Sequence, residues 1–312
     1  MTKELRVVRA ADLEARAPDE PKWLIDGLWG AGAVGVIGGA PKSCKTFLAL
    51  EMAVAVASGR PCLGRYAVPG AGAALVFGAE DPPEDVRDRL VGLARARGVD
   101  FAALDVRLIV EPALRLDRGE DVARLRATLA RHRPRLLVLD PWVRLQRCDE
   151  NKATEVSAVL GVLRELSREF AISIALVHHT RKEPGAHPGQ ELRGSGDFHA
   201  WGDSNLYLHR RRERIALSIE HRSAASPPPV RLEFVTGDDG ARLEARDGPV
   251  ELPLSERIVE LLAEAPRRLD DLRELLRVRK QALLEILRAL EAEGRVARHN
   301  GCWQAVNRRS GS

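Results

Sequence analysis

Short apolar runs alternate with amphipathic helical patterns along the first part of the chain. Each run is nearly all apolar and lacks the alternation of a half-exposed strand, which is typical of parallel strands buried on both faces. We expect five such strands, at residues 34–37, 73–77, 106–110, 136–139 and 172–177. Helical patterns lie between them at residues 46–58, 84–97, 120–131 and 154–168. The alternation predicts an α/β domain with a mainly parallel central sheet and right-handed crossovers.

The pattern changes after Asp203, where short strand-like stretches follow one another without helices between them. They cover residues 204–208, 214–219, 230–234 and 242–245. We expect these stretches to add antiparallel strands to one edge of the sheet. Residues 226–229 contain consecutive prolines, which cannot donate to a ladder, so this run is expected to be a loop or an edge.

From Leu254 the pattern is helical again, with three successive apolar faces whose residues recur at spacings of three and four. Gly294 then ends the last helix in the manner of a C-terminal cap. Two strand-like pieces follow, and the Asn300-Gly301 pair between them is a strong hairpin signal. Three helices followed by a hairpin predict a small winged-helix domain. The predicted division of the chain is a flexible lead-in at 1–22, a large domain at 23–250, the winged helix at 254–306 and a tail at 307–312.

The composition is that of a globular protein with an aliphatic core: 312 residues, 45% hydrophobic, 30% charged and 4% aromatic. No apolar run approaches the ~20 residues that a membrane helix needs, and the N-terminus has no signal-peptide core. The four cysteines are scattered without a CxxC pair, which argues against a disulfide framework and a structural zinc site. We therefore expect a cytoplasmic protein without membrane contact.

The strongest chemical signal lies between the first predicted strand and the first predicted helix. It consists of Gly39, Ala40, Pro41, Lys42, Ser43, Cys44, Lys45 and Thr46. Strand, loop and helix in this order are the context of a Walker A loop, whose backbone N–H groups hold phosphates at a helix N-terminus. Lys45 is expected to reach the β- and γ-phosphates of ATP, and the Thr46 hydroxyl to bind Mg²⁺.

Cys44 stands where this motif has a glycine before the lysine. A side chain there could crowd the phosphate or require a different backbone angle. Because cysteine is small and the helix begins here, we expect a helical conformation to suffice. A thiol beside a positive loop could have a depressed pKa, although a packed small side chain is the simpler interpretation.

Two carboxylates are predicted to complete the hydrolytic machinery. Asp140 ends an apolar strand in the manner of a Walker B aspartate and is expected to hold Mg²⁺. The next residue is Pro141, so the glutamate that serves as base in AAA+ enzymes is absent at this position. Glu80 ends a neighbouring strand and would face the same crevice, where a carboxylate can activate the attacking water. We interpret Glu80 as the base and Asp81 as the cap of the next helix, although Glu80 could itself be a cap.

These segments together resemble a known family. GAPKSCKT, GAEDPPEDVRDRL, LLVLDPWVRLQRCDENKATEV and IALVHHTRK occur in the order and spacing of the RecA-like hexameric ATPases. The resemblance covers residues 23–234 and is stronger to plasmid RepA-type replicative helicases than to DnaB helicases. It implies a RecA-like P-loop NTPase fold that hydrolyses ATP between the subunits of a homo-oligomer, with a hexamer favoured. It also implies single-stranded DNA in the ring channel.

The resemblance implies roles for polar residues near the later strands. His178, or His179 beside it, would sense the γ-phosphate. The residues alone leave two alternatives: one histidine is buried and the other exposed without a role in the site, or the histidines bind a metal. The implied DNA-facing residues are Arg144 and Arg147 in a loop at 142–152, Arg181 and Lys182 in a loop at 180–192, and Arg193 after it. Their charge suits phosphate contacts, although each could be a solvated surface residue.

The stretch Ile219-Glu220-His221-Arg222 matches the strand from which DnaB-like subunits send a Lys-x-Arg pair into a neighbour's ATP site. Arg222 therefore resembles an arginine finger that acts in trans. Glu220 stands in place of the lysine, which reverses the charge. From the residues alone, Arg222 could also be a surface residue of its strand.

The predicted winged helix is expected to bind duplex DNA with its third helix in the major groove. Arg277, Arg279 and Lys280 stand at the start of that helix. The whole chain has a net charge of only +4, and from Pro253 onward 12 Lys and Arg outnumber 9 Asp and Glu. Because acidic residues dilute this charge, a protein-binding role for the domain stays open.

Three functions are compatible with these patterns. The first is a DNA-dependent ATPase motor, a ring-forming helicase or translocase. The second is an ATP-switched regulatory protein whose winged helix selects a DNA site. The third is a scaffold that binds nucleotide without hydrolysing it, because Cys44 has weakened turnover.

Overall fold

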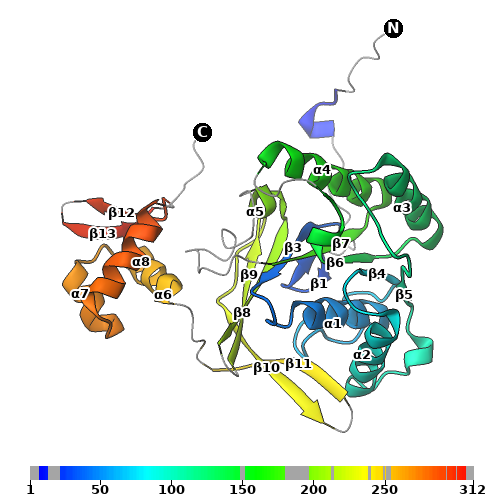
Figure 1. The fold of residues 1–312 in the computed structure, drawn as a ribbon, viewed down its shortest axis with the longest axis horizontal. Helices are drawn as coiled ribbons and strands as arrows, with labels where there is room; N and C mark the ends of the chain where they lie inside the picture. Colours follow the sequence, from blue (N-terminus) through cyan, green and yellow to red (C-terminus); the bar gives the residue numbers. More distant parts are fainter. Residues whose placement is uncertain are drawn as a thin grey trace.

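The computed structural model describes residues 7–12, 22–147, 152–179, 197–211, 214–237, 240–248, 250, 254–292, 294–299 and 301–306. The larger part of the described chain is built on a nine-stranded sheet with the order β11-β10-β9-β8-β3-β7-β6-β4-β5. Figure 1 shows this sheet with helices against both of its faces. The predicted α/β architecture, with parallel strands and antiparallel strands beside them, is confirmed.

Five neighbouring parallel strands, each predicted from an apolar run, form one side of the sheet. They are β3 (Val34–Gly39), β4 (Ala74–Gly78), β5 (Val106–Leu108), β6 (Leu136–Asp140) and β7 (Ser173–His179). The helices between them are α1 (Lys45–Ser58), α2 (Pro83–Ala96), α3 (Gly119–His132) and α4 (Ala153–Phe170). Because β7 and β6 lie between β3 and β4 in space, the carboxyl ends of four strands surround the loop that follows β3.

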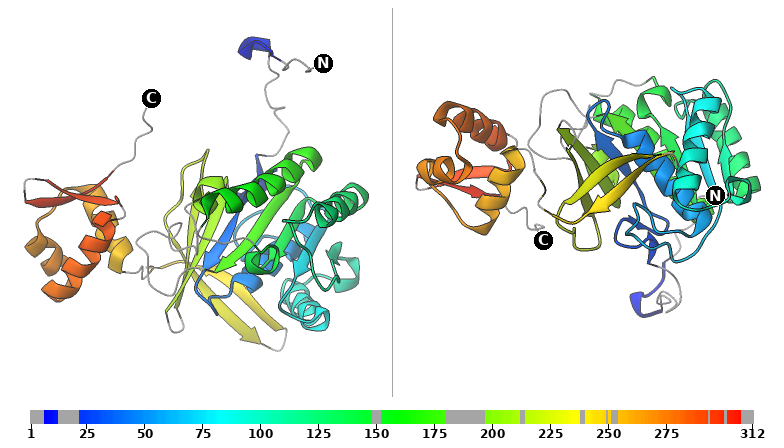
Figure 2. Two further views of the ribbon diagram at one scale, coloured as in Figure 1. Left: turned by 45° about the horizontal axis from the view of Figure 1, so that its top comes forward. Right: turned by 90° about the horizontal axis from the view of Figure 1, so that it is seen from below.

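The helices form one layer on each side of the parallel strands (Figures 1 and 2), with α1 and α2 on one face and α3 and α4 on the other. Successive residues of one strand enter different cores. Leu136 and Val138 pack with the α1 side, whereas Leu137 and Leu139 pack with the α4 side. Side chains alternate along a strand, so a strand covered on both faces needs an apolar residue at nearly every position.

The sheet continues beyond β3 through β8 (Ser204–Arg211), β9 (Arg214–His221), β10 (Val230–Gly237) and β11 (Gly240–Arg246). All four strands pair antiparallel with one another in this order, as predicted. On its other side β8 pairs with β3, and this pairing is parallel. The chain enters β8 beside the amino end of β3, where the Asp203 amide donates to the Val34 carbonyl at 2.7 Å. Both strands therefore start at the same end of the sheet and run in the same direction.

The hairpin of β10 and β11 lies against α2 (Figure 1). Gly240 begins β11 with a φ of 112°, and a Cβ there would stand 2.8 Å from the Cα of Gly92 in α2. The backbones of hairpin and helix approach this closely because both positions are glycine.

Several short elements were not predicted, since two to five residues carry too little periodicity to identify. They are η1 (Ala10–Asp12), β1 (Trp23–Ile25), β2 (Trp29–Gly30), η2 (Phe101–Ala103), η3 (Trp142–Arg144) and α5 (Asp197–Trp201). Of these, β1 and β2 pair as a small antiparallel sheet in which Trp29 is buried.

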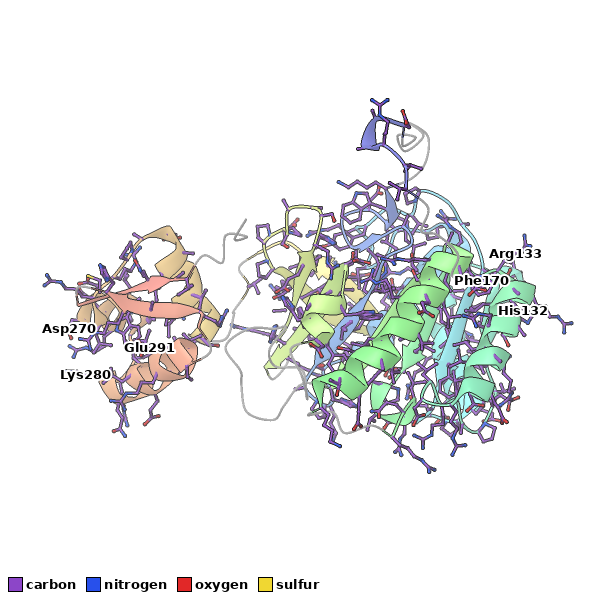
Figure 3. The ribbon with its side chains drawn as sticks, turned by 90° about the horizontal axis from the view of Figure 1, so that it is seen from above. His132, Arg133, Phe170, Asp270, Lys280 and Glu291 are labelled. Atoms are coloured by element: carbon purple, nitrogen blue, oxygen red, sulfur yellow. The ribbon has the colours of Figure 1, made fainter. Side chains whose placement is uncertain are left out.

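The C-terminal part consists of α6 (Leu254–Glu264), α7 (Leu269–Leu276), α8 (Lys280–Ala292), β12 (Val296–His299) and β13 (Cys302–Ala305). Lys280 and Glu291, labelled in Figure 3, mark the two ends of α8. The three helices and the hairpin share a core of their own that includes Ile258, Leu287 and Trp303. Across the described ranges, no helix combines the length and apolar character needed to cross a bilayer.

Candidate nucleotide-binding site

The loop between β3 and α1 has an unusual backbone conformation. Lys42 and Cys44 both have positive φ values, 64° and 71°. The expectation of a helical Cys44 is therefore wrong: the residue stands in the left-handed region, where glycine is favoured, and helical angles begin at Lys45. Its thiol is half-buried, and this burial raises its pKa rather than lowering it, although Arg210 and Lys45 act in the opposite direction.

Lys45 lies inside this loop. Its side chain is buried, and its Nζ donates to the Ala40 carbonyl at 2.8 Å. Burial lowers the pKa of Lys45 to about 8, while the carboxylates of Asp140 and Glu80 act to raise it. The Ala40 carbonyl thus holds the ammonium group of Lys45 within the loop. A phosphate oxygen could replace this carbonyl as the acceptor of the hydrogen bond from Lys45.

The hydroxyl of Thr46 and the carboxylate of Asp140 meet at the start of α1 and the end of β6. A hydrogen bond from Thr46 and the charge of Lys45 both favour the ionised form of Asp140, but burial outweighs them and raises its pKa to about 6. A hydroxyl and a carboxylate are hard oxygen donors of the kind that Mg²⁺ prefers. The buried Ser43 Oγ has no hydrogen-bond partner within the described chain, which fits a loop shaped around an anionic ligand.

These residues surround one cavity of about 300 Å³. Its walls come from the loop, from α1 and from the ends of β4, β6 and β7. Among the predicted site residues, the cavity brings together Lys42, Ser43, Cys44, Lys45, Thr46, Glu80 and Asp140. Carboxylates and cations therefore meet where four strand ends surround a helix N-terminus, which is the usual place for a ligand in such a sheet.

The two histidines at the end of β7 face opposite sides of the sheet. His179 lines the cavity together with Val177, whereas His178 is 2% exposed and does not line it. The ring of His178 lies 4.3 Å from that of Phe198, in the core on the α4 side. Of the two residues expected as a phosphate sensor, the strand therefore presents His179 to the cavity.

Arg89 of α2 also lines the cavity and was not singled out by the sequence. It forms an ion pair with Asp81 and lies 6.0 Å from the centre of the Phe47 ring. The expectation that Asp81 caps α2 is wrong, because Pro82 occupies the N-cap position. The Asp81 carboxylate instead accepts a hydrogen bond from Arg89, two helical turns later. No local pattern marks Arg89, because only the packing of α2 brings it to the phosphate loop.

Glu80 lines the cavity and also contacts a cation of another segment. Its Oε1 lies 3.4 Å from Nε of Arg144, which ends η3. The side chains of Glu80 and Arg144 are 45% and 60% exposed. A predicted base and a predicted DNA-facing arginine are therefore neighbours in one subunit.

Arg222 lies far from the phosphate loop of its own chain. It follows β9, and its amide donates to the Asp203 carbonyl at the edge where β3 begins, whereas the loop follows the other end of β3. Its guanidinium is 3.7 Å from the Asp203 carboxylate and also donates to the Ala200 carbonyl. The fold does not bring Arg222 and Glu80 together within one subunit.

The remaining predicted residues are surface groups or lie outside the described ranges. Arg147 is exposed, and its backbone amide donates to Asp117 at 3.1 Å. Arg277 and Arg279 are exposed between α7 and α8, and Lys280, which begins α8, is exposed as well. Arg181, Lys182 and Arg193 lie outside the described residues. Among the described residues, no group of three or more His, Cys, Asp or Glu is placed to hold a metal ion.

Comparisons with known proteins agree with this geometry. The family model described as "AAA domain" matches residues 2–185, and no curated protein matches the chain. Among solved structures, one described as an ATPase domain superposes with a TM-score of 0.52 at 14% identity, covering 68% of this chain and 84% of that one. A DnaB-like replicative helicase superposes with a TM-score of 0.51 at 14% identity, covering 68% of this chain and 59% of that longer one. The chain belongs to the AAA domain family and is a P-loop ATPase with the RecA-like fold of these helicase domains.

Proposed function

We propose that the protein is a DNA-dependent ATPase motor, a ring-forming helicase or translocase that acts on single-stranded DNA. The observation that carries this proposal is the distribution of catalytic groups over the sheet. Lys45, Thr46, Glu80 and Asp140 line one cavity at the carboxyl ends of the parallel strands, whereas Arg222 lies near their amino ends. Such a site is completed when a second subunit supplies the arginine.

In this proposal the loop from Gly39 to Thr46 holds the phosphates of ATP with its backbone amides, and Lys45 contacts the β- and γ-phosphates. Thr46 and Asp140 would hold Mg²⁺, which neutralises charge on the phosphate oxygens. Glu80 orients a water molecule and accepts its proton as the oxygen attacks the γ-phosphorus and the bond to the β-phosphate oxygen breaks. Arg89 of α2 and His179 of β7 line the same cavity and would face these phosphates.

The proposed ring places Arg222 beside the ATP of the next subunit. An arginine finger stabilises the charge that develops on the transferred phosphoryl group. The Asp203 carboxylate and the Ala200 carbonyl hold Arg222 at the surface, where its side chain is 51% exposed. A closed ring of identical head-to-tail interfaces meets this requirement, and a hexamer is favoured.

DNA contact is proposed for two parts of the molecule. Arg144 and Arg147, with Arg181, Lys182 and Arg193 beyond the described ranges, would contact the backbone of single-stranded DNA in the channel. The C-terminal helices and hairpin have the element order of a winged helix, and Arg277, Arg279 and Lys280 would contact duplex DNA at the start of α8.

Phosphate release from ATP, with and without single-stranded DNA, tests the proposal. We expect DNA to stimulate the wild-type rate and Glu80→Gln to lower the stimulated rate by about 10²-fold or more, because the amide cannot accept the proton. Glu80→Gln should still bind ATP, which a fluorescent ATP analogue measures. If DNA does not change the wild-type rate, the motor proposal is wrong.

The C-terminal domain favours a second candidate, an ATP-switched DNA-binding regulator. Its support is the exposed basic group of Arg277, Arg279 and Lys280 at the start of a helix. This candidate predicts sequence-specific duplex binding that ATP modulates, without unwinding. Selection of duplex sequences in the presence and absence of ATP, followed by an unwinding assay, distinguishes the two candidates. If ATP binds but no phosphate is released, a non-hydrolysing scaffold is indicated instead.

A further inference from the structure

The contact between Glu80 and Arg144 joins the proposed base to the proposed DNA-facing segment. Oε1 of Glu80 lies 3.4 Å from Nε of Arg144. The same carboxylate lines the cavity that contains Lys45 and Asp140. One guanidinium therefore faces the group that is expected to activate water.

The turn that carries Arg144 is anchored at one end and exposed at the other. It follows Asp140 after a single residue and begins with Trp142, which is fully buried and packs against Phe198. Val143 beside it is 46% exposed, and the Arg144 side chain is 60% exposed. Arg144 is thus fixed in position by its backbone, while its side chain is accessible to an external ligand.

A phosphate is a strong competitor for this guanidinium. Exposed Arg–carboxylate pairs are held only weakly, because water and salt screen them. A backbone phosphate offers the guanidinium two oxygens in a bidentate arrangement. When a phosphate replaces Glu80 as the partner of Arg144, the carboxylate of Glu80 is released. The replacement therefore acts directly on the proposed base.

We propose that Arg144 is a positioning residue that restrains Glu80 until DNA binds; the inference rests on the proposed DNA-dependent function. Without DNA, Arg144 holds the carboxylate so that Oε1 faces the guanidinium instead of the attacking water. When a phosphate of single-stranded DNA engages Arg144, Glu80 turns to accept the proton of water. DNA binding is thereby converted into faster hydrolysis within one subunit.

The test compares phosphate release by the full-length wild type, Arg144→Ala, Arg144→Lys and Arg126→Ala, each with and without a single-stranded oligonucleotide. Arg126→Ala is the matched control, because it also removes an exposed arginine–glutamate pair, with Glu169 at 2.8 Å, away from the cavity. For Arg144→Ala we expect the DNA-free rate to rise about two- to five-fold, the range that loss of an exposed ion pair allows. Stimulation by DNA should fall by the same factor.

The variants separate restraint from simple DNA contact. Arg144→Lys keeps a cation near Glu80 and should restore a low DNA-free rate, and Arg126→Ala should behave as the wild type. An unchanged or lowered DNA-free rate for Arg144→Ala would overturn the inference. If the DNA-free rate is unchanged but half-maximal stimulation needs a higher DNA concentration, Arg144 only contacts a DNA phosphate and does not restrain Glu80. The proposed function fails in a different measurement, namely a wild-type rate that does not respond to DNA.

Discussion

At the scale of the residue, the phosphate loop contains backbone angles that side chains generally avoid. Cys44 has a φ of 71° at the position where the motif has glycine. A left-handed conformation costs about 1–2 kcal/mol for a residue with a Cβ. The strand before the loop and the helix after it are both well packed, so the surrounding structure holds this conformation against its cost.

Substitutions at Cys44 measure this strain. We expect Cys44→Gly to exceed Cys44→Ala in free energy of unfolding by about 1 kcal/mol, because alanine keeps the Cβ in the left-handed region. Both variants lose the contact of Sγ with Arg210 at 3.6 Å, so the comparison isolates the backbone. Urea unfolding under identical conditions gives the difference. Equal stabilities of the two variants would contradict the assigned conformation.

At the scale of the element, the alternation of strand side chains decides which groups reach the site. Val177 and His179 face the cavity, while His178 enters the opposite core. Neighbouring residues of a strand point to opposite faces, so a shift of one position exchanges their roles. The sequence placed both histidines at the end of a strand, but only the pairing of β7 with β3 in the sheet decided which of the two lines the cavity.

The contact between α2 and the β10–β11 hairpin gives a second stability prediction. Gly240→Ala should lower the free energy of unfolding by more than about 1 kcal/mol. The reason is twofold: its φ is 112°, and the new Cβ would approach the Gly92 backbone to 2.8 Å.

Gly237→Ala is the control for this prediction, because a Cβ at Gly237 in the same hairpin would meet nothing within 4 Å and its φ is not in the positive region. Thermal unfolding of both variants measures the contrast. Similar losses from the two substitutions would show that the close approach of helix and hairpin is not the cause.

At the scale of the whole molecule, one subunit holds two incomplete halves of a proposed site. The cavity lies at the carboxyl ends of the parallel strands, and Arg222 lies at their amino ends beside Asp203. One subunit cannot close this distance without unfolding its sheet. A head-to-tail arrangement joins the two halves and explains why an arginine finger would be placed so far from its own loop.

Mixing two inactive variants tests this arrangement. Arg222→Ala should reduce ATP turnover by about 10³-fold or more, as loss of an arginine finger does. Glu80→Gln should be inactive for a different reason, and mixed rings of the two should regain activity. Intact interfaces form wherever a subunit with Glu80 meets a neighbour with Arg222. No recovery after exchange of subunits would contradict catalysis in trans.

The sequence by itself determined the main strands and helices and the residue types of the phosphate loop. Apolar runs identified each of the five parallel strands, and Lys45, Thr46, Glu80 and Asp140 all line one cavity. The strand predictions succeeded because apolar runs and loop motifs are local properties that a short stretch of chain encodes.

Tertiary structure alone decided the features that depend on distant segments. The parallel pairing of β8 with β3, the place of Arg89 and the contact of Glu80 with Arg144 all join residues from separate elements. Asp81 was expected to cap α2, but Arg89 two turns away proved the better partner for its carboxylate. No local pattern encodes these contacts, because packing of helices and strands sets the distances between the side chains.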